Sequence, residues 1–338
     1  MHSTLNITSK VNDYTVTFVD LLENIIKEIQ QPNTITFIDF NVAKLYPQLN
    51  LNNVILIPAT EESKTLEYAD EVFSKLSELK ANVKTKMVVI GGGILQDICG
   101  FCASTYCRGI EYILVPTTLL AQADSCIGGK TSINFQNKKN LIGTFYPPSK
   151  ILIYSRFTNT LSKLDYISGL GEVYKFHILQ NKIHEFDSNS DIEAMIYDGL
   201  NYKVGILLKD EFDRAERKFL NFGHTFGHAL ESVSNHKIPH GIAVILGCMI
   251  AVRISKHIGF NVNNYDTVLI KGASLLKMSE MKFKKEWFDF DVLLPIIKSD
   301  KKSTGQLTMV LIDNNPILKD IENLDIIQPI LTKIYESI

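Results

Sequence analysis

Short β-branched runs alternate with helical patterns through the first half of this chain, and this alternation restricts the possible folds more than any other feature. Segments 21–30 (LLENIIKEIQ) and 65–80 (TLEYADEVFSKLSELK) place apolar residues at helical spacing between such runs. Strands that alternate with helices predict a parallel, doubly wound sheet. The predicted strands are YTVTFVD (14–20), TITFIDF (34–40), NVILIPA (53–59), KMVVIGGG (86–93), YILVPTT (112–118) and KILIYS (150–155).

The strand pattern fades after about residue 155, where long helical patterns take over. One late run, LTMVLID (307–313), again resembles a strand, and the sequence contains no repeat, low-complexity tract or flexible linker. We therefore predict an α/β N-terminal domain with a Rossmann-like parallel sheet over residues 1–154. An all-α C-terminal domain over residues 155–338 is expected to pack directly against it.

The charge balance argues against two classes of partner. The formal net charge of −2 and the pI near 6.5 give no electrostatic reason to expect nucleic acid or an anionic membrane. The N-terminus has no basic stretch followed by an apolar one, and no segment approaches the roughly 20 apolar residues that span a bilayer, which predicts a cytoplasmic protein. Cys99, Cys102 and Cys107 lack a fourth ligand at suitable spacing, and Cys99 and Cys102 lie in an amphipathic helical pattern, so buried free thiols are favoured over a metal cluster.

Three consecutive glycines, Gly91, Gly92 and Gly93, end a predicted strand and open a predicted helix. Backbone amides at such a helix start, with no Cβ atoms in the way, can hold a pyrophosphate. A plain tight turn explains the same residues equally well, and the Gly-x-Gly-x-x-Gly fingerprint is not matched. The glycines nevertheless stand at the carboxyl end of a strand, where open α/β sheets bind ligands.

Two further clusters are polar in a way that a hydrophobic core does not favour. The segment PTTLLAQADSCIGGKTSIN (116–134) combines hydroxyl residues, Asp124 and Lys130 with a glycine pair, and Lys139 and Asn140 follow it. Such residues suit the oxygens of ribose, phosphate and polyols, although a solvated loop remains an alternative.

A histidine pair suggests a catalytic metal site. His224 and His228 are four residues apart in NFGHTFGHALE, so both imidazoles lie on one side of a helix. Glu172 in GLGEVYK and His240 in IPHGIAV complete a possible ligand set, and three protein ligands leave a coordination position open for chemistry. A packed or solvated helix face is the alternative for the histidine pair alone.

Six segments together resemble, in order and spacing, the 3-dehydroquinate synthases of the sugar phosphate cyclase superfamily. The resemblance runs from about Asp39 to Lys302 and implies an NAD-binding α/β domain, a helical metal-binding domain and an active site between them. It also implies NAD, a divalent metal (zinc first, cobalt second), a small sugar phosphate as substrate and a homodimer. The segments are GGGILQDICGFCASTYCRGI, VPTTLLAQADSCIGGKTSIN, KKNLIGTFYPP, GLGEVYK, NFGHTFGHALE and HG.

The resemblance assigns roles residue by residue. It implies that Glu172, His224 and His240 bind the metal, and it makes His228 a catalytic imidazole instead of a ligand. Lys175 and Asp213 are the other implied catalytic residues. The implied NAD contacts are Asp39, Asn41, Glu61, Lys64, Gly92, Gly93, Ile94, Asp97, Thr117, Thr118, Leu120, Asp124, Lys130, Lys139, Asn140, Thr160 and Leu161. The implied substrate contacts are Arg108 from a neighbouring subunit, Asp124, Lys130, Asn140, Lys175, Lys203, Arg217, Asn221, His228, Lys301 and Lys302.

The reaction that the resemblance implies is the conversion of 3-deoxy-D-arabino-heptulosonate 7-phosphate to 3-dehydroquinate and phosphate in the shikimate pathway. It proceeds by transient oxidation with NAD, phosphate elimination, re-reduction and aldol closure, so the cofactor is regenerated at each turnover. The resemblance favours an acidic heptulosonate, because relatives that cyclise sugar phosphates without a carboxylate alter the positions matching Arg217 and Asn221, and this chain keeps both residues. A guanidinium can hold a carboxylate bidentately. Three alternatives stay open: an amino-dehydroquinate, 2-deoxy-scyllo-inosose or valiolone cyclase, a metal-dependent polyol or alcohol dehydrogenase, and a non-enzymatic scaffold.

Five positions depart from the family pattern. Gln96 stands where glycine is usual, Lys138 replaces a glycine, and Gly171 replaces the alanine before Glu172. Ile242 takes the place of a glutamate, and Asp213 takes that of another glutamate with an implied catalytic role. None of these departures removes an implied metal ligand or phosphate contact, but they put the detailed fit of the substrate in question.

Overall fold

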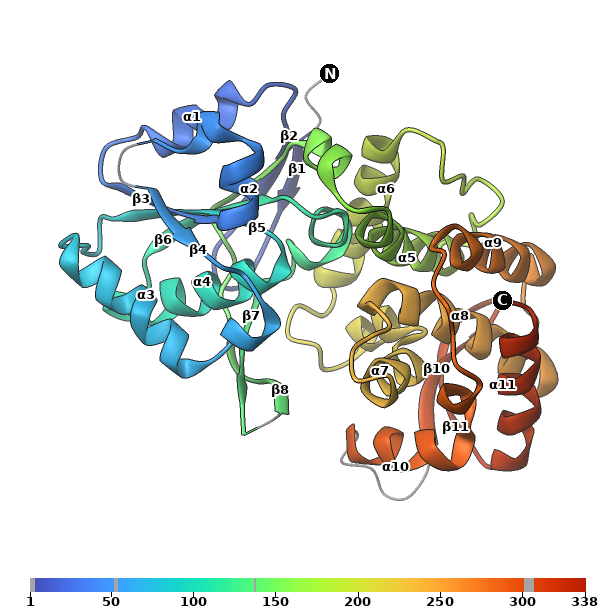
Figure 1. Cartoon of the computed structure of the whole chain (residues 1–338). Helices are drawn as coiled ribbons and strands as arrows, with labels where there is room; N and C mark the ends of the chain where they lie inside the picture. The colour runs from blue at the N-terminus through green and yellow to red at the C-terminus, as the bar shows by residue number, and fades with distance from the viewer. Residues whose placement is uncertain (1–3, 52–53, 137, 301–306) are drawn as a thin grey trace. The chain divides into compact units, whose positions relative to one another are not determined.

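A computed structural model describes residues 4–51, 54–136, 138–300 and 307–338, without the side chains of residues 299 and 300 (Figure 1). The chain forms two compact units. The first contains residues 1–161 and 207–212, and the second contains residues 162–206 and 213–338. The functional boundary predicted after residue 154 stays a prediction.

A mixed sheet forms the centre of the first unit. Among the described residues it has seven strands in the order β1-β2-β9-β6-β5-β3-β4, and every neighbouring pair is parallel except β1 with β2. The six predicted strands are confirmed, whereas the antiparallel edge strand β1 was not predicted. The strands are β1 (Thr4–Ile7), β2 (Tyr14–Phe18), β3 (Thr34–Asp39), β4 (Val54–Ile57), β5 (Lys86–Gly91), β6 (Glu111–Pro116) and β9 (Lys150–Ile153).

Helices cover both faces of this sheet. In Figure 1, α1 (Glu23–Ile29) and α2 (Phe40–Leu45) lie over one face, while α3 (Leu66–Glu78) and α4 (Gly93–Thr105) lie under the other. Successive strand residues point to opposite faces and both faces are covered, so the central strands are buried at nearly every position. The core on the first face comprises Val19, Ile25, Ile29, Ile38, Ala43, Leu49, Val88, Ile90, Ile113, Val115, Leu152 and Phe157.

A separate antiparallel hairpin follows the short helical turn Ala121–Ser125. It pairs β7 (Lys130–Phe135) with β8 (Lys138–Phe145), and Thr131 Oγ1 lies 2.7 Å from Thr144 Oγ1 across the pair. This segment was expected only as a polar ligand-binding or solvated region. The hairpin was missed because polar residues dominate both strands, so no apolar alternation marks them.

The second unit is mainly helical, as predicted, but it also contains an antiparallel hairpin. LTMVLID, which resembled a strand, is β10, and it pairs with β11, so the expectation of an all-α domain is wrong in this detail. The elements are α5 (Lys163–Leu179), α6 (Ile192–Leu207), α7 (His224–Val233), α8 (His240–His257), α9 (Tyr265–Met278), α10 (Phe290–Asp300), β10 (Leu307–Asp313), β11 (Asn315–Ile321) and α11 (Ile327–Glu336).

Helix α8 is the centre of the second unit. Within the described residues it is the one helix that by length and composition could cross a membrane, with a mean hydropathy of 1.2. However, 78% of its residues are buried inside the protein, which is typical of a core helix. Its neighbours include α5, α7, α9, α11 and β10.

Candidate metal centre and nucleotide site

Three helices bring Glu172, His224 and His240 together. Glu172 lies in the middle of α5 and is fully buried, whereas the two histidines are the first residues of α7 and α8. Gly223 precedes α7 in a left-handed conformation (φ 79°), and Pro239 precedes α8 with φ −61°. These two residues turn the chain into each helix, so both imidazoles stand at helix starts.

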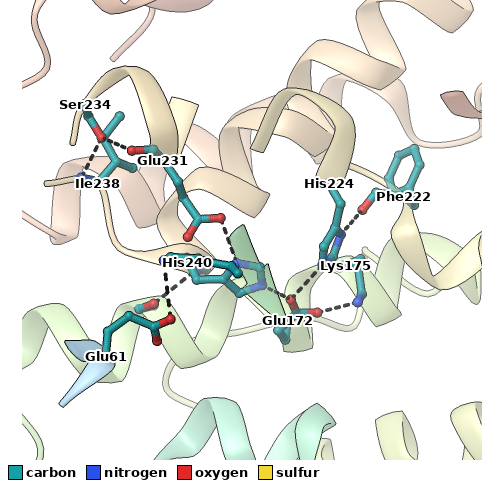
Figure 2. A network of polar contacts seen from close by, with 12 residues as sticks. Glu61, Glu172, Lys175, Phe222, His224, Glu231, Ser234, Ile238 and His240 are labelled. Carbon is teal, nitrogen blue, oxygen red and sulfur yellow. Dashed lines mark hydrogen bonds and ion pairs between the residues drawn. The ribbon is translucent and has the colours of Figure 1, made fainter. Parts of the chain in front are cut away.

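The ligand atoms meet at one oxygen of Glu172 (Figure 2). Its Oε1 atom lies 3.2 Å from Nε2 of His240 and 3.5 Å from Nε2 of His224. The three donor atoms all lie within 4.8 Å of one another. This spacing is suitable for a cation placed between them.

The other nitrogen of each ring is already engaged. His224 Nδ1 donates to the carbonyl oxygen of Phe222 over 3.1 Å, and His240 Nδ1 donates to Glu231 Oε2 over 3.0 Å (Figure 2). Both bonds fix ring orientation and aim the Nε2 atoms at Glu172. A carboxylate or carbonyl behind the imidazole is the usual outer partner of a metal-binding histidine.

The electrostatics of the cluster suit a cation. Burial raises the pKa of Glu172, but its ion pair with Lys175 and the hydrogen bonds of the two histidines outweigh this effect and hold the pKa well below its usual range. Burial, then the Lys175 ammonium, lowers the pKa of His224 to about 4, so this ring is neutral. Burial also disfavours charge on His240, but Glu172 and Glu231 outweigh it and raise the pKa of His240 to about 10.

The protonation states of these three residues suit a divalent cation. Glu172 supplies an ionised oxygen, and His224 is neutral with its Nε2 lone pair available. A proton and a metal ion compete for Nε2 of His240, and the two nearby carboxylates stabilise either positive charge. A set of two imidazoles and one carboxylate accepts several divalent metals and leaves a position open for a substrate oxygen.

His228 lies one helical turn from His224 and is exposed. Its ring centroid is 5.2 Å from that of His224 and 5.8 Å from that of His240. With Glu231 and His240 it forms a second group whose donor atoms lie within 4.8 Å of one another. The structure therefore brings all three histidines together, with His228 on the solvent side.

Several predicted catalytic and substrate residues of the second unit carry buried positive charge. Lys175 (1% exposed), Lys203 (5%) and Arg217 (4%) come from α5, α6 and the 3-10 turn Glu216–Asn221. A cation buried this deeply needs an anionic partner, and Glu172 supplies one for Lys175. Asn221 is exposed at the end of the same turn, and Asp213 adopts a left-handed backbone conformation (φ 60°). Lys301 and Lys302 lie outside the described residues.

In the first unit, the predicted cofactor residues gather at the carboxyl edge of the sheet. Parallel strands end at the same edge, and β3, β4, β5 and β6 are neighbours in the sheet. Gly92 is the N-cap of α4, and a Cβ atom there would lie 2.9 Å from Thr118 Cγ2. The residues at or after these strand ends are Asp39, Asn41, Glu61, Lys64, Gly92, Gly93, Ile94, Asp97, Thr117, Thr118 and Leu120.

One hydrogen bond and one ion pair join this edge to the β7–β8 hairpin. Lys64 is 4% exposed, and its Nζ donates to Asp97 Oδ2 over 2.6 Å and to Asn140 Oδ1 over 2.5 Å. Lys139 Nζ lies 3.8 Å from Glu61 Oε1. Burial raises the pKa of Asp97, against the opposing effect of Lys64. The structure thus places five of the predicted cofactor residues next to one another.

Not every predicted residue joins such a cluster. Asp39 caps α2, because its Oδ1 accepts from the amides of Asn41 and Val42 over 2.8 and 3.2 Å. Thr160 and Leu161 lie in and after the turn Ser155–Thr160, which follows β9.

The remaining predicted residues of this unit lie around the hairpin and its neighbouring loops. Arg108 is exposed with a left-handed backbone (φ 65°), and Lys130 is exposed at the start of β7. Asp124 belongs to the short helical turn before that strand.

The structure explains some of the departures from the family pattern. Gln96 is buried in α4, and its Nε2 donates to the Gly91 carbonyl over 3.2 Å, which ties the helix to the strand end. Ile242 is fully buried in α8, and Lys138 is exposed at the start of β8. Nothing in the structure explains why lysine stands at position 138.

Glu231 is a further candidate site residue, which was not predicted from the sequence. It lies seven residues after His224 and three after His228 on α7, so the helical spacing placed it on the same face. Its partner His240 comes from another helix, and this contact could not be read from the sequence.

Comparisons with known proteins identify the class. The structure of 2-deoxy-scyllo-inosose synthase with carbaglucose-6-phosphate, NAD+ and Co2+ matches with a TM-score of 0.84, 22% identity and 98% and 100% coverage of the two chains. The structure of ValA, a 2-epi-5-epi-valiolone synthase from Streptomyces hygroscopicus subsp. jinggangensis with NAD+ and Zn2+, matches with a TM-score of 0.81 and 22% identity. The match covers 98% of this chain and 99% of ValA. The fold is therefore that of the dehydroquinate synthase-like cyclases.

The sequence comparisons are more specific. Residues 54–168 match the family described as 3-dehydroquinate synthase N-terminal, and residues 169–303 match 3-dehydroquinate synthase C-terminal. A 3-dehydroquinate synthase of Dictyoglomus turgidum is 39% identical over 294 residues, which cover 82% of this chain and 81% of the relative. This chain belongs to the 3-dehydroquinate synthase family.

Proposed function

We propose that this enzyme converts 3-deoxy-D-arabino-heptulosonate 7-phosphate to 3-dehydroquinate and phosphate in the shikimate route to aromatic amino acids. It would be a carbon–oxygen lyase that depends on NAD and on a divalent cation, zinc first and cobalt second. The observation that carries the proposal is the convergence of Glu172 Oε1 with Nε2 of His224 and of His240. Membership of the family supports it.

Glu172, His224 and His240 would hold the metal, which when bound would polarise a substrate hydroxyl and ease the loss of its proton. Lys175 keeps Glu172 ionised, because their ion pair lies in the protein interior. His228 is proposed to move protons, since it is exposed and lies on the same helix face as His224. Asp213 keeps the catalytic role that the resemblance implied for its position.

Anionic groups of the substrate would meet the buried cations of the second unit. The heptulosonate phosphate carries a carboxylate and a phosphate, and each needs a cationic partner. We assign Arg217 to the carboxylate, because its planar guanidinium can donate bidentately, and Lys203 to the phosphate. Asn221, Lys301 and Lys302 are proposed as further substrate contacts.

The carboxyl edge of the sheet in the first unit is the proposed NAD site. The N-terminus of α4 at Gly92 and Gly93 offers unobstructed amides for the pyrophosphate. These residues would hold NAD, whose nicotinamide would supply reversible hydride transfer. The full contact set remains the one that the resemblance implies, including Asp39 and Thr160.

The residues that the resemblance also assigned to substrate in the first unit are Asp124, Lys130 and Asn140. Arg108 is exposed and is proposed to reach the active site of a second copy in a homodimer. A cytoplasmic location also stays a prediction.

One experiment tests this function. Purified protein is incubated with NAD, Zn2+ or Co2+ and the heptulosonate phosphate, and phosphate release and product mass are measured. We expect stoichiometric phosphate and a carbocyclic product with no lasting NADH. Turnover of glucose 6-phosphate or sedoheptulose 7-phosphate in preference would instead indicate an inosose or valiolone cyclase, and accumulation of NADH would indicate a dehydrogenase.

A further inference from the structure

The three proposed metal ligands share a feature that the proposed function does not explain. Each ligand stands next to a glycine in the sequence, and each of these glycines lies where two helix backbones are in direct contact. Real Cβ atoms essentially never lie within 3.0 Å of a heavy atom of a residue that is not a chain neighbour, and Cβ atoms added at these glycines would do so. The pairs are Gly171–Glu172, Gly223–His224 and His240–Gly241.

At Gly171 and Gly241, the backbones of α5 and α8 lie directly against each other. A Cβ atom on Gly241 would lie 1.6 Å from the carbonyl oxygen of Ser168, and one on Gly171 would lie 2.1 Å from the carbonyl oxygen of Gly241. The amide of Gly241 donates to Ser168 Oγ over 3.0 Å. Because these atoms are backbone, no side-chain rotation can relieve an added methyl group.

The contact between α7 and α8 has the same character. A Cβ atom on Gly247 would lie 1.8 Å from the carbonyl oxygen of Gly223, the residue before His224. Gly247 follows Gly241 by six residues, which at 3.6 residues per turn places the two roughly 120° apart around α8. One glycine therefore faces α5 and the other faces α7.

We propose that Gly241 and Gly247 are positioning residues of the metal site: they let α5 and α7 lie against α8 closely enough for Glu172 Oε1 to reach both imidazoles. Helix axes normally lie about 8–10 Å apart, depending on the side chains between them. A methyl group at either glycine moves one ligand-bearing helix away. Metal–ligand distances tolerate about 0.2 Å, so such a movement weakens binding.

This inference rests on the proposed metal site but extends it to Gly247, which is seven residues from His240 and has no ligand beside it in the sequence. Gly247 lets the carbonyl of Gly223 lie against α8, and this contact positions the neighbouring His224. A purely structural role would lower stability without changing the coordination of a bound ion. The two roles are therefore separable by spectroscopy.

The test compares Gly241→Ala and Gly247→Ala with two controls. In Gly272→Ala, the new methyl meets Met249 Sδ at 2.7 Å and the Tyr174 hydroxyl at 2.8 Å, so it crowds α9 against side-chain ends of α8 and α5 and not against backbone beside a ligand. In Gly205→Ala, nothing lies within 4 Å of the new methyl. Each variant is titrated with Co2+ alone, its visible absorption spectrum is recorded, and thermal unfolding is measured without metal.

We expect Gly241→Ala and Gly247→Ala to lose about 10-fold or more in Co2+ affinity, similar to the loss of an outer-shell partner, with an altered absorption spectrum. Gly272→Ala should unfold at a lower temperature yet bind Co2+ with the wild-type spectrum. Gly227→Ala extends the series if the larger perturbations prevent folding. Its methyl lies 3.2 Å from the Ala243 carbonyl oxygen and needs a shift of only a few tenths of an ångström, so a smaller loss of affinity is expected.

Wild-type affinity and spectrum in Gly247→Ala, or in Gly227→Ala where Gly247→Ala does not fold, would overturn the positioning role. Equal losses in Gly272→Ala would overturn it as well, because they would make the effect one of general stability. Failure of the wild-type protein to bind Co2+ would instead overturn the proposed function.

Discussion

Removing the carboxylate behind His240 tests the metal site at a residue that is not itself a ligand. Glu231 Oε2 accepts from His240 Nδ1 over 3.0 Å, and the glutamate side chain is 14% exposed. Glu231→Gln keeps an acceptor but loses the charge. A charge-assisted hydrogen bond contributes about 1 kcal/mol more than a neutral one, so metal affinity should fall about 5-fold.

Glu231→Ala removes the acceptor altogether and frees the imidazole to rotate. Loss of an outer-shell partner typically costs about 10- to 100-fold in metal affinity, which corresponds to roughly 1.4–2.7 kcal/mol. Affinities for Zn2+ and Co2+ are measured by competition with a chromophoric chelator. We expect the order wild type, Glu231→Gln, Glu231→Ala from tightest to weakest.

Asp198→Asn is the matched control for the Glu231 variants. Asp198 Oδ1 accepts from Lys182 Nζ over 2.9 Å in the same unit, so the substitution also removes a paired carboxylate, but not one that contacts a histidine of the site. Metal affinity should stay at the wild-type value. If Glu231→Ala binds Zn2+ as tightly as the wild type, Glu231 does not orient the His240 ring for metal binding.

Three further predictions concern the ligands of the metal, NAD and substrate. His224→Ala should abolish metal retention with the far-UV circular dichroism spectrum unchanged, and full occupancy by elemental analysis would contradict the assignment. Gly92→Val should block NAD binding in calorimetry, because a branched side chain would stand at the start of α4, where even a Cβ atom approaches Thr118 Cγ2 to 2.9 Å; unchanged affinity would place the cofactor elsewhere. Arg217→Met should lower kcat/KM for the heptulosonate about 30-fold or more, because losing a buried charge pair costs about 2–5 kcal/mol. Lys203→Met should instead lower kcat/KM for every phosphorylated sugar. Intact turnover by Arg217→Met would remove the argument for an acidic substrate.

The strands of the parallel sheet could be predicted because they are buried on both faces. Runs such as KMVVIG in β5 are then apolar at successive positions and stand out from the helices between them. The β7–β8 hairpin gave no such signal, since β8 is exposed or half-buried at every position. The late hairpin was half predicted: β10 is mainly buried, but its partner β11 is mainly exposed.

The candidate site divides in the same way between local and tertiary features. The spacing of His224 and His228 is a property of one helix, so the sequence predicted that the two rings share a face. The bond from His240 to Glu231 joins two helices and depends on how they pack. Gly171 was recognised only as a departure from alanine, because the proximity of the Gly241 carbonyl becomes visible only when α5 and α8 are placed together.

In the proposed reaction, oxidation by NAD is transient and serves phosphate elimination. The most direct measurement follows NADH fluorescence and phosphate release together during a single turnover of the heptulosonate phosphate by the enzyme loaded with NAD and Zn2+. We expect NADH to rise and return to its starting level while stoichiometric phosphate is released, and a chelator to abolish both signals. NADH that persists after turnover, or a signal that the chelator leaves unchanged, would contradict the proposed reaction.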